Sequence, residues 1–171
     1  LYCRHEPERI SFGLGWDHYD TEGRYIQADF GKLSIASLYL PSGSSSEARH
    51  ANELVFMQRF AEQLKNMRKQ RREFIICGNW QLAHTAADLQ DTDSNSNKSG
   101  FLAEERQWMD ELLEGGYVDA FREINSDSDE FSWWPEGGGA AVAGAINFPS
   151  YPRLSWRQSR SWVTPSGSKI D

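Results

Sequence analysis

Cysteine is nearly missing from this 171-residue sequence, which contains only Cys3 and Cys77. Two cysteines are too few for a disulfide framework, so we expect a fold held by its core and a reducing cytoplasm as the compartment. Cys77 closes an apolar segment and is predicted to be a buried free thiol. Because no apolar run approaches the ~20 residues of a membrane span and no signal-peptide pattern opens the sequence, we expect no membrane partner.

Positive charge is also scarce, since 18 Lys and Arg stand against 25 Asp and Glu for a formal net charge of −7. General nucleic-acid binders are usually basic, so this balance argues against that class. It does not argue against a protein with an acidic site beside a local basic rim. Hydrophobic residues (39%) and aromatic residues (13%) are plentiful, which predicts one globular domain with a sizeable core. We expect a monomer.

Two β-rich segments near the start of the chain predict a hairpin. Arg24 to Phe30 and Leu33 to Leu40 partly alternate in polarity and are separated by Gly31-Lys32. A Ser-rich loop follows, in which Ser44 and Glu47 have capping-box spacing. The helix predicted after it has one apolar face, made of Leu54, Met57, Phe60, Ala61, Leu64 and Met67.

The middle of the chain continues this alternation of strands and helices, which indicates an α/β fold. Glu73 to Gly78 predicts a buried central strand, and the polar segment 86–100 predicts a long surface loop. Leu102 to Leu113 has helical spacing, with Glu104 and Glu105 placed to interact with the helix dipole. Residues 117–121 and 131–134 are predicted to be short strands, and periodicity is lost after Trp134.

The segment Ile75 to Thr85 (IICGNWQLAHT) is the most informative for function. Its strand ends in Gly-Asn-x-Gln, so Asn79 and Gln81 are predicted to share one face of the strand. Active sites in α/β proteins gather at the carboxyl ends of strands. The alternative from this local pattern is that Asn79 and Gln81 only form a turn and a cap.

This segment resembles the Gly-Asp-Trp/Tyr-Asn-Ile-Ala-His-Thr motif of the exonuclease III family. Other segments resemble the same family in the same order: LYCRHEP, EGRYIQADFG, SLYLPSGSS, SGFLAEERQWMDELLEGGYVDAFR and FSWW. The resemblance covers roughly residues 1–134 and ends with a remnant at 145–148. It implies a partial endonuclease/exonuclease/phosphatase domain over residues 1–148, with a non-family tail over 149–171. The implied fold is α/β, a partial two-sheet β-sandwich flanked by helices and truncated at both ends.

The resemblance also implies an activity. Enzymes of this family hydrolyse phosphodiesters of double-stranded DNA at abasic sites and 3′ ends, using Mg²⁺ or Mn²⁺. A water molecule attacks phosphorus in line while a metal and polar donors neutralise the charge that develops on the phosphoryl oxygens.

The residues implied for catalysis match the family unevenly. Tyr39 matches the tyrosine whose hydroxyl lies at the scissile phosphate, although packing in the core is the alternative. Asn79 stands where the family has the aspartate that activates water, and Asn147 stands where it has a second aspartate. Gln81 replaces a phosphate-binding asparagine. As metal ligands, Asn79 and Gln81 form only a weak set.

Further family positions are expected to be missing. The metal-binding asparagine and glutamate belong to amino-terminal strands that have no match here, and the closing Ser-Asp-His has none either. The expected activity is therefore weak or nil. The alternatives are a non-catalytic remnant that binds DNA and a degraded or frameshifted gene product. A chain without these strands is also expected to be poorly soluble or partly unfolded.

Five residues are candidates for DNA contact. Trp133 and Trp134 match family aromatics near the DNA-facing rim, where a ring can wedge beside an unstacked nucleotide, and core packing is the alternative. Arg24, Lys98 and Arg106 are candidates for phosphate contacts.

Overall fold

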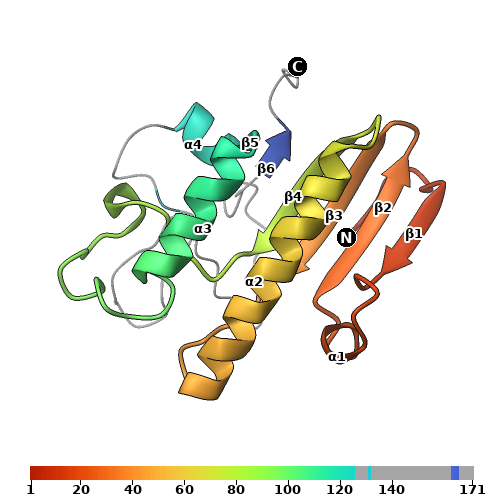
Figure 1. Ribbon diagram of the computed structural model, residues 1–171. Coiled ribbons are helices and arrows are strands. Elements are labelled where there is room, and N and C mark those ends of the chain that lie inside the picture. The colour runs from red at the N-terminus through yellow and green to blue at the C-terminus, as the bar shows by residue number, and fades with distance from the viewer. Residues whose placement is uncertain (126–130, 132–162, 166–171) are drawn as a thin grey trace.

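The computed structural model describes residues 1–125, 131 and 163–165, which form one mixed sheet covered on one face by helices (Figure 1). The sheet has six strands in the order β1-β2-β3-β4-β6-β5. This confirms the α/β class. The described residues form a single sheet, so the second sheet of the predicted sandwich is not found among them. The elements in chain order are β1 (Arg9–Phe12), α1 (Asp17–Asp20), β2 (Tyr25–Phe30), β3 (Leu33–Tyr39), α2 (Glu47–Arg68), β4 (Glu73–Asn79), a 3₁₀ turn (Ala86–Asp88), α3 (Ala103–Glu114), β5 (Tyr117–Asp119), α4 (Ala120–Ile124) and β6 (Val163–Pro165).

The predicted hairpin is confirmed as β2 and β3. The two strands are antiparallel from Tyr25 opposite Leu38 to Phe30 opposite Leu33. β3 then pairs in parallel with β4, in a register that ends with Tyr39 opposite Asn79. Because parallel strands end at the same edge of a sheet, these two residues are brought side by side.

Helix α2 begins two residues later than the capping-box pattern indicated. Ser46 is the N-cap, because its backbone is extended and its hydroxyl accepts from the Arg49 amide at 3.2 Å. Ser44 instead shares a 3.0 Å hydrogen bond with the hydroxyl of Ser42, so the predicted box with Glu47 is wrong. The apolar face is confirmed, with Phe56 added to it. Its fully buried positions are Phe56, Met57, Phe60, Leu64 and Met67.

Aromatic rings join the helices to the sheet. Phe60 lies between Phe56 and Trp80, with ring centroids 5.7 and 6.2 Å away, and Trp80 lies 6.2 Å from Trp108 of α3. The Trp108 indole N–H also donates to the backbone carbonyl oxygen of Met57 at 2.8 Å. Rings in such edge-to-face and offset pairs stabilise a core beyond their buried area. The helix layer is therefore fixed to the sheet near the carboxyl end of β4.

Most other predicted elements are found, with shifted ends. β4 extends to Asn79, and α3 runs from Ala103 to Glu114. The predicted strand at 117–121 is only half right, because the Asp119 carboxylate accepts from the amides of Phe121 and Arg122 and starts α4. Strand β1 and helix α1 were not predicted. Nor was β6, which lies inside the predicted tail and pairs with β4 and β5.

The face of the sheet away from α2 leaves apolar side chains exposed. Ile10 pairs with Ala28 and Phe12 with Ile26, so both project from the face opposite the core residue Tyr25. Phe12 is 78% exposed. Among the described residues, no helix has the length and hydropathy needed to cross a membrane.

Candidate functional site

The parallel strands β3 and β4 end in a polar edge formed by Tyr39 and Asn79. Tyr39 is 47% exposed, so it is not the packed core aromatic that its strand position allowed. The Arg24 guanidinium lies over the Tyr39 ring, 5.1 Å from its centroid, and donates to the Tyr39 carbonyl oxygen at 3.2 Å. A cation–π contact of this kind holds a positive charge beside the tyrosine ring. Two predicted site residues, Arg24 and Tyr39, are therefore brought together.

Gly78 places Asn79 at this edge. It has a φ of +139°, and a Cβ added there would overlap the backbone of Leu38 on the neighbouring strand. Only glycine permits this close approach of the two strands. Asn79 follows directly and is buried.

The prediction that Asn79 and Gln81 share one strand face is wrong. The strand ends at Asn79, and Gln81 has a left-handed backbone with a φ of +58°. The Asn79 side-chain oxygen accepts from the Gln81 amide at 3.2 Å, which is the hydrogen bond of an Asx turn. Asn79 therefore forms a turn, as the alternative prediction had it. The alternation of side chains between strand faces does not extend past Asn79 to Gln81.

The remaining basic candidates lie on the loop and helix beyond Gln81. The Ala83 amide donates to the Gly100 carbonyl oxygen at 2.7 Å, which holds the end of the long loop against the chain after β4. Lys98 is exposed on this loop, where its ammonium donates to Asn95 at 3.2 Å. The Arg106 guanidinium lies over the Phe101 ring at 4.7 Å. Trp133, Trp134 and Asn147 lie outside the described residues.

The polar edge does not by itself fit a magnesium site. Mg²⁺ prefers hard oxygen ligands, with at least one or two carboxylates. Asn79 and Gln81 are neutral amides, and the Asn79 oxygen already accepts a backbone hydrogen bond. Within the described residues, one group of three His, Cys, Asp or Glu side chains is arranged so that it could hold a metal ion.

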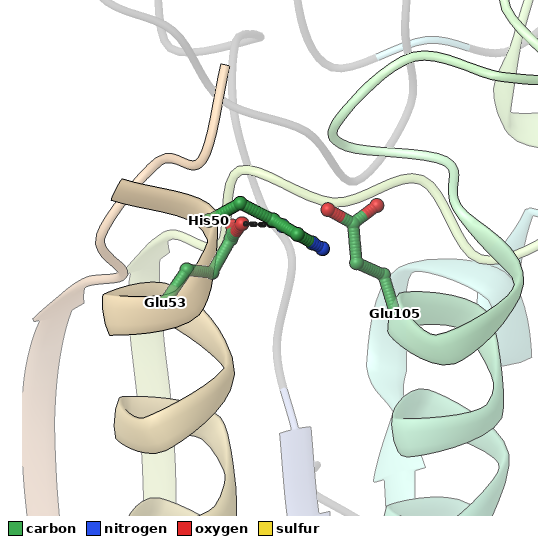
Figure 2. Close-up of side chains that lie close together, drawn as sticks. All are labelled: His50, Glu53 and Glu105. Carbon is green, nitrogen blue, oxygen red and sulfur yellow. Dashed lines mark hydrogen bonds and ion pairs between the residues drawn. The ribbon is translucent and has the colours of Figure 1, made fainter. Parts of the chain in front are cut away.

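That group consists of His50 and Glu53 on α2 and Glu105 on α3 (Figure 2). The His50 Nδ1 atom lies 3.3 Å from the Glu53 carboxylate, and Nε2 lies 3.2 Å from exposed Glu104. Glu105 accepts from the amides of Gly100 and Leu102 at 2.8 and 2.7 Å. This is the capping role expected of a first-turn carboxylate. We call His50, Glu53 and Glu105 the interhelix cluster.

Burial and like charge shape the electrostatics of the interhelix cluster. Burial raises the pKa of Glu53 to about 7, and the neighbouring Glu105 carboxylate adds to the effect. Burial also raises the pKa of Glu105. For His50, burial opposes protonation, but hydrogen bonds to Glu104 and Glu53 outweigh it, so its pKa is raised. The sequence reasoning missed this cluster, although His50 and Glu53 have the i, i+3 spacing of neighbours on one helix face.

Solved structures place the fold among those of AP endonucleases. An AP endonuclease from Archaeoglobus fulgidus matches with a TM-score of 0.74 and 21% identity, over 94% of this chain and 59% of that one. The 3′ phosphatase NExo from Neisseria, solved with a product DNA hairpin, matches with a TM-score of 0.71 and 19% identity, over 97% of this chain and 73% of that one. The mixed sheet with its helix layer is thus an AP-endonuclease-type fold.

Sequence relatives agree with this class, although no family model matches the chain. An exodeoxyribonuclease from Bacillus subtilis is 28% identical over 141 residues, which are 82% of this chain and 56% of that protein. The DNA repair nuclease APEX1 from Danio rerio is 30% identical over 135 residues, or 78% of this chain and 43% of that protein. The chain belongs to the exonuclease III and AP endonuclease family. It spans about half the length of these relatives.

Proposed function

We propose that this chain binds DNA phosphodiesters at the polar edge formed by Tyr39 and Asn79, and that hydrolysis there is weak. The implied parent reaction is metal-dependent cleavage of double-stranded DNA at abasic sites or 3′ ends. One observation carries the proposal: the parallel register brings Tyr39 and Asn79, the residues that the family resemblance implies for catalysis, side by side at the carboxyl ends of β3 and β4.

The chemistry of this edge favours phosphate binding over proton removal. The Tyr39 hydroxyl is a hydrogen-bond donor on a half-exposed ring, and the Arg24 guanidinium beside it is a cation that also pairs with the carboxylate of Glu22. Both groups suit an anionic phosphate oxygen. Asn79 supplies an amide oxygen, which accepts a hydrogen bond but cannot take a proton from an attacking water at neutral pH. Efficient hydrolysis therefore lacks its base.

The proposal is tested by measuring the affinity of the chain for a duplex with one abasic site, by fluorescence anisotropy at ~50 and ~200 mM salt. We expect binding that weakens as salt rises, because contacts to phosphates release counterions. Arg24→Ala is expected to weaken binding, whereas Arg71→Ala, an exposed arginine at the opposite end of β4, is not. An absence of binding at the lower salt concentration contradicts the proposal, as does an equal loss in both variants.

A purely non-catalytic role in DNA binding is the second candidate. It is favoured by the neutral amides at Asn79 and Gln81, neither of which can accept a proton from an attacking water. Under this candidate, restoring the acid with Asn79→Asp leaves cleavage undetectable while binding persists. Mg²⁺ and Mn²⁺ are both included in the assay, because Asn79 and Gln81 would need additional ligands to hold either ion.

We also infer the remaining features that the family resemblance implies. The six-stranded sheet is proposed to be one layer of a two-sheet sandwich, which is supported by the exposure of Ile10 and Phe12 on the face away from α2. Cys3 and Cys77 are both free thiols, in keeping with the proposed reducing cytoplasm.

A further inference from the structure

The interhelix cluster joins the first two turns of α2 to the first turn of α3 through groups that bind metals in other proteins. One ligand atom from each of His50, Glu53 and Glu105 lies within 4.8 Å of the other two (Figure 2). We propose that the interhelix cluster binds one divalent transition-metal ion, such as Zn²⁺, which clips α2 to α3. This inference does not rest on the proposed action on DNA.

The charge of the cluster favours a cation. Glu53 and Glu105 are both fully buried, so their like charges repel each other with little screening by solvent. A dication between two carboxylates and a neutral imidazole gives a net charge of zero. Without a metal ion, the charge of the two carboxylates must be met by protons, on a carboxyl group or on His50, whose Nδ1 lies 3.3 Å from Glu53.

A buried oxygen of Glu53 provides an independent observation. Among the residues that the structure describes, the Glu53 Oε1 atom has no hydrogen-bond partner and no exposed surface. Buried acceptors are almost always paired, and leaving one unpaired is unfavourable. Figure 2 shows the Glu53 carboxylate against the His50 ring, with Glu105 facing the ring from the other helix. An ion at this place would satisfy the unpaired oxygen.

The surroundings hold the candidate ligands in position. Backbone amides fix Glu105, as described above, and the Gly43 amide donates to Glu53. A Cβ at Gly43 would overlap the Glu53 carboxylate and lie 2.9 Å from the His50 Cα atom. The loop before α2 therefore packs directly on the cluster. Such supporting hydrogen bonds orient the ligands of protein metal sites.

The ligand types indicate the class of metal. One imidazole nitrogen and two carboxylates suit Zn²⁺ or Mn²⁺, whereas Mg²⁺ and Ca²⁺ prefer oxygen ligands alone. The His50 Nδ1 to Glu53 Oε2 distance of 3.3 Å, a hydrogen bond in this structure, matches the spacing of about 3.3 Å between two ligands on a tetrahedral zinc ion, and all three candidate ligand atoms lie within 4.8 Å of one another. Glu104, 3.2 Å from His50 Nε2, is near enough to orient the ring.

The test is to titrate the full chain, first stripped with a chelator, with Zn²⁺ and separately with Mg²⁺, by calorimetry and thermal unfolding. We expect one Zn²⁺ per chain and a rise in Tm of about 5 °C or more at saturation, with a much smaller response to Mg²⁺. Glu53→Gln and His50→Gln are each expected to lower the affinity for Zn²⁺ at least ~10-fold. Glu62→Gln, which changes an exposed glutamate on the same helix, is expected to leave it unchanged.

Glu53→Gln is expected to fold, because it removes one of two repelling buried carboxylates, so a loss of Zn²⁺ affinity in this variant can be assigned to the lost ligand. Its metal-free Tm is expected to be at least that of the unmodified chain. Equal Zn²⁺ responses in the unmodified chain, Glu53→Gln and His50→Gln would overturn the proposal. Absence of a Zn²⁺ response would overturn it too, and so would a response abolished by Cys3→Ser, because that would place the ion on the amino-terminal segment.

Discussion

The polar edge and the interhelix cluster differ in where they keep their charge. The edge presents a half-exposed tyrosine and an arginine paired with Glu22, beside the buried amide of Asn79, whereas the cluster buries two carboxylates next to a part-buried histidine between helices. Gly100 lies between the two regions, because its amide donates to Glu105 and a Cβ there would lie 2.9 Å from the Gln81 carbonyl oxygen. The interhelix cluster therefore gathers its carboxylates in the helix layer, away from the positions that the family resemblance implies for catalysis.

The helix layer is expected to dominate stability. Phe60→Ala removes a fully buried ring that contacts Phe56 and Trp80. We expect the free energy of unfolding to fall by ~3–5 kcal/mol, measured by denaturant titration. The control is Val55→Ala, a half-exposed site on α2, where a change below ~1 kcal/mol is expected. A small change in the free energy of unfolding for Phe60→Ala would contradict the claim that the packing of α2 on the sheet dominates stability.

Gly78→Ala tests whether the close approach of β3 and β4 at Gly78 is needed for stability. The added methyl group would overlap the backbone of Leu38, and the φ of +139° is unfavourable for alanine. We expect a loss of more than ~2 kcal/mol of stability in chemical denaturation. Gly23→Ala is the matched control, because Gly23 also has a positive φ but nothing near its Cβ, so only ~1 kcal/mol is expected. Equal losses would mean that strand proximity at Gly78 is unimportant.

The elements that the sequence predicted correctly are those with local signals. The apolar face of α2 and the continuous run of β4 follow directly from periodicity, and their burial agrees. Strand β6 has three residues and pairs with strands distant in sequence, so no local pattern indicates it. The side chains of Asn79 and Gln81 could not be placed from alternation, because the left-handed backbone at Gln81 ends the strand geometry. The interhelix cluster depends on the packing of two helices, which the sequence does not specify locally.

Low pH is expected to destabilise the sheet at a residue that belongs to neither the polar edge nor the interhelix cluster. Burial alone would raise the pKa of Asp29, but hydrogen bonds from Ser34 and Gln27 and the charges of Arg72 and Arg9 outweigh it, so its pKa is lowered. A carboxyl whose pKa is lower in the folded state stabilises the fold above its unfolded pKa of ~4 and loses that contribution as pH falls through the folded value.

The matching variant is Asp29→Asn. At pH 7 it is expected to reduce stability by about 1–2 kcal/mol, because the hydrogen bonds to a charged acceptor are weakened. The difference from the unmodified chain should shrink in unfolding experiments carried out below about pH 3. A difference that stays constant between pH 7 and pH 3 would contradict a role for the charged carboxylate.

Tyr39→Phe should have the smallest effect on stability, and it separates the role of the polar edge in binding from the role of the helix layer in stability. No hydrogen bond to the Tyr39 hydroxyl is found within the described residues, and its ring is half-exposed, so we expect a change below ~0.5 kcal/mol in thermal unfolding. Affinity for the abasic duplex is expected to fall about 5-fold or more, the effect of losing one hydrogen bond of ~1 kcal/mol or more. Unchanged affinity would remove Tyr39 from the proposed phosphate site.

The most direct measurement of the central claim is cleavage of a duplex with one abasic site by the unmodified chain and by Asn79→Asp, each with Mg²⁺ and with chelator. Restoring a carboxylate base at Asn79 is expected to raise metal-dependent cleavage by at least ~100-fold over the unmodified chain, the usual contribution of a general base. Thermal unfolding of both proteins ensures that folded chains are compared. Metal-dependent cleavage by the unmodified chain at the same rate as Asn79→Asp would contradict the claim that the neutral amide of Asn79 is what weakens hydrolysis at this edge.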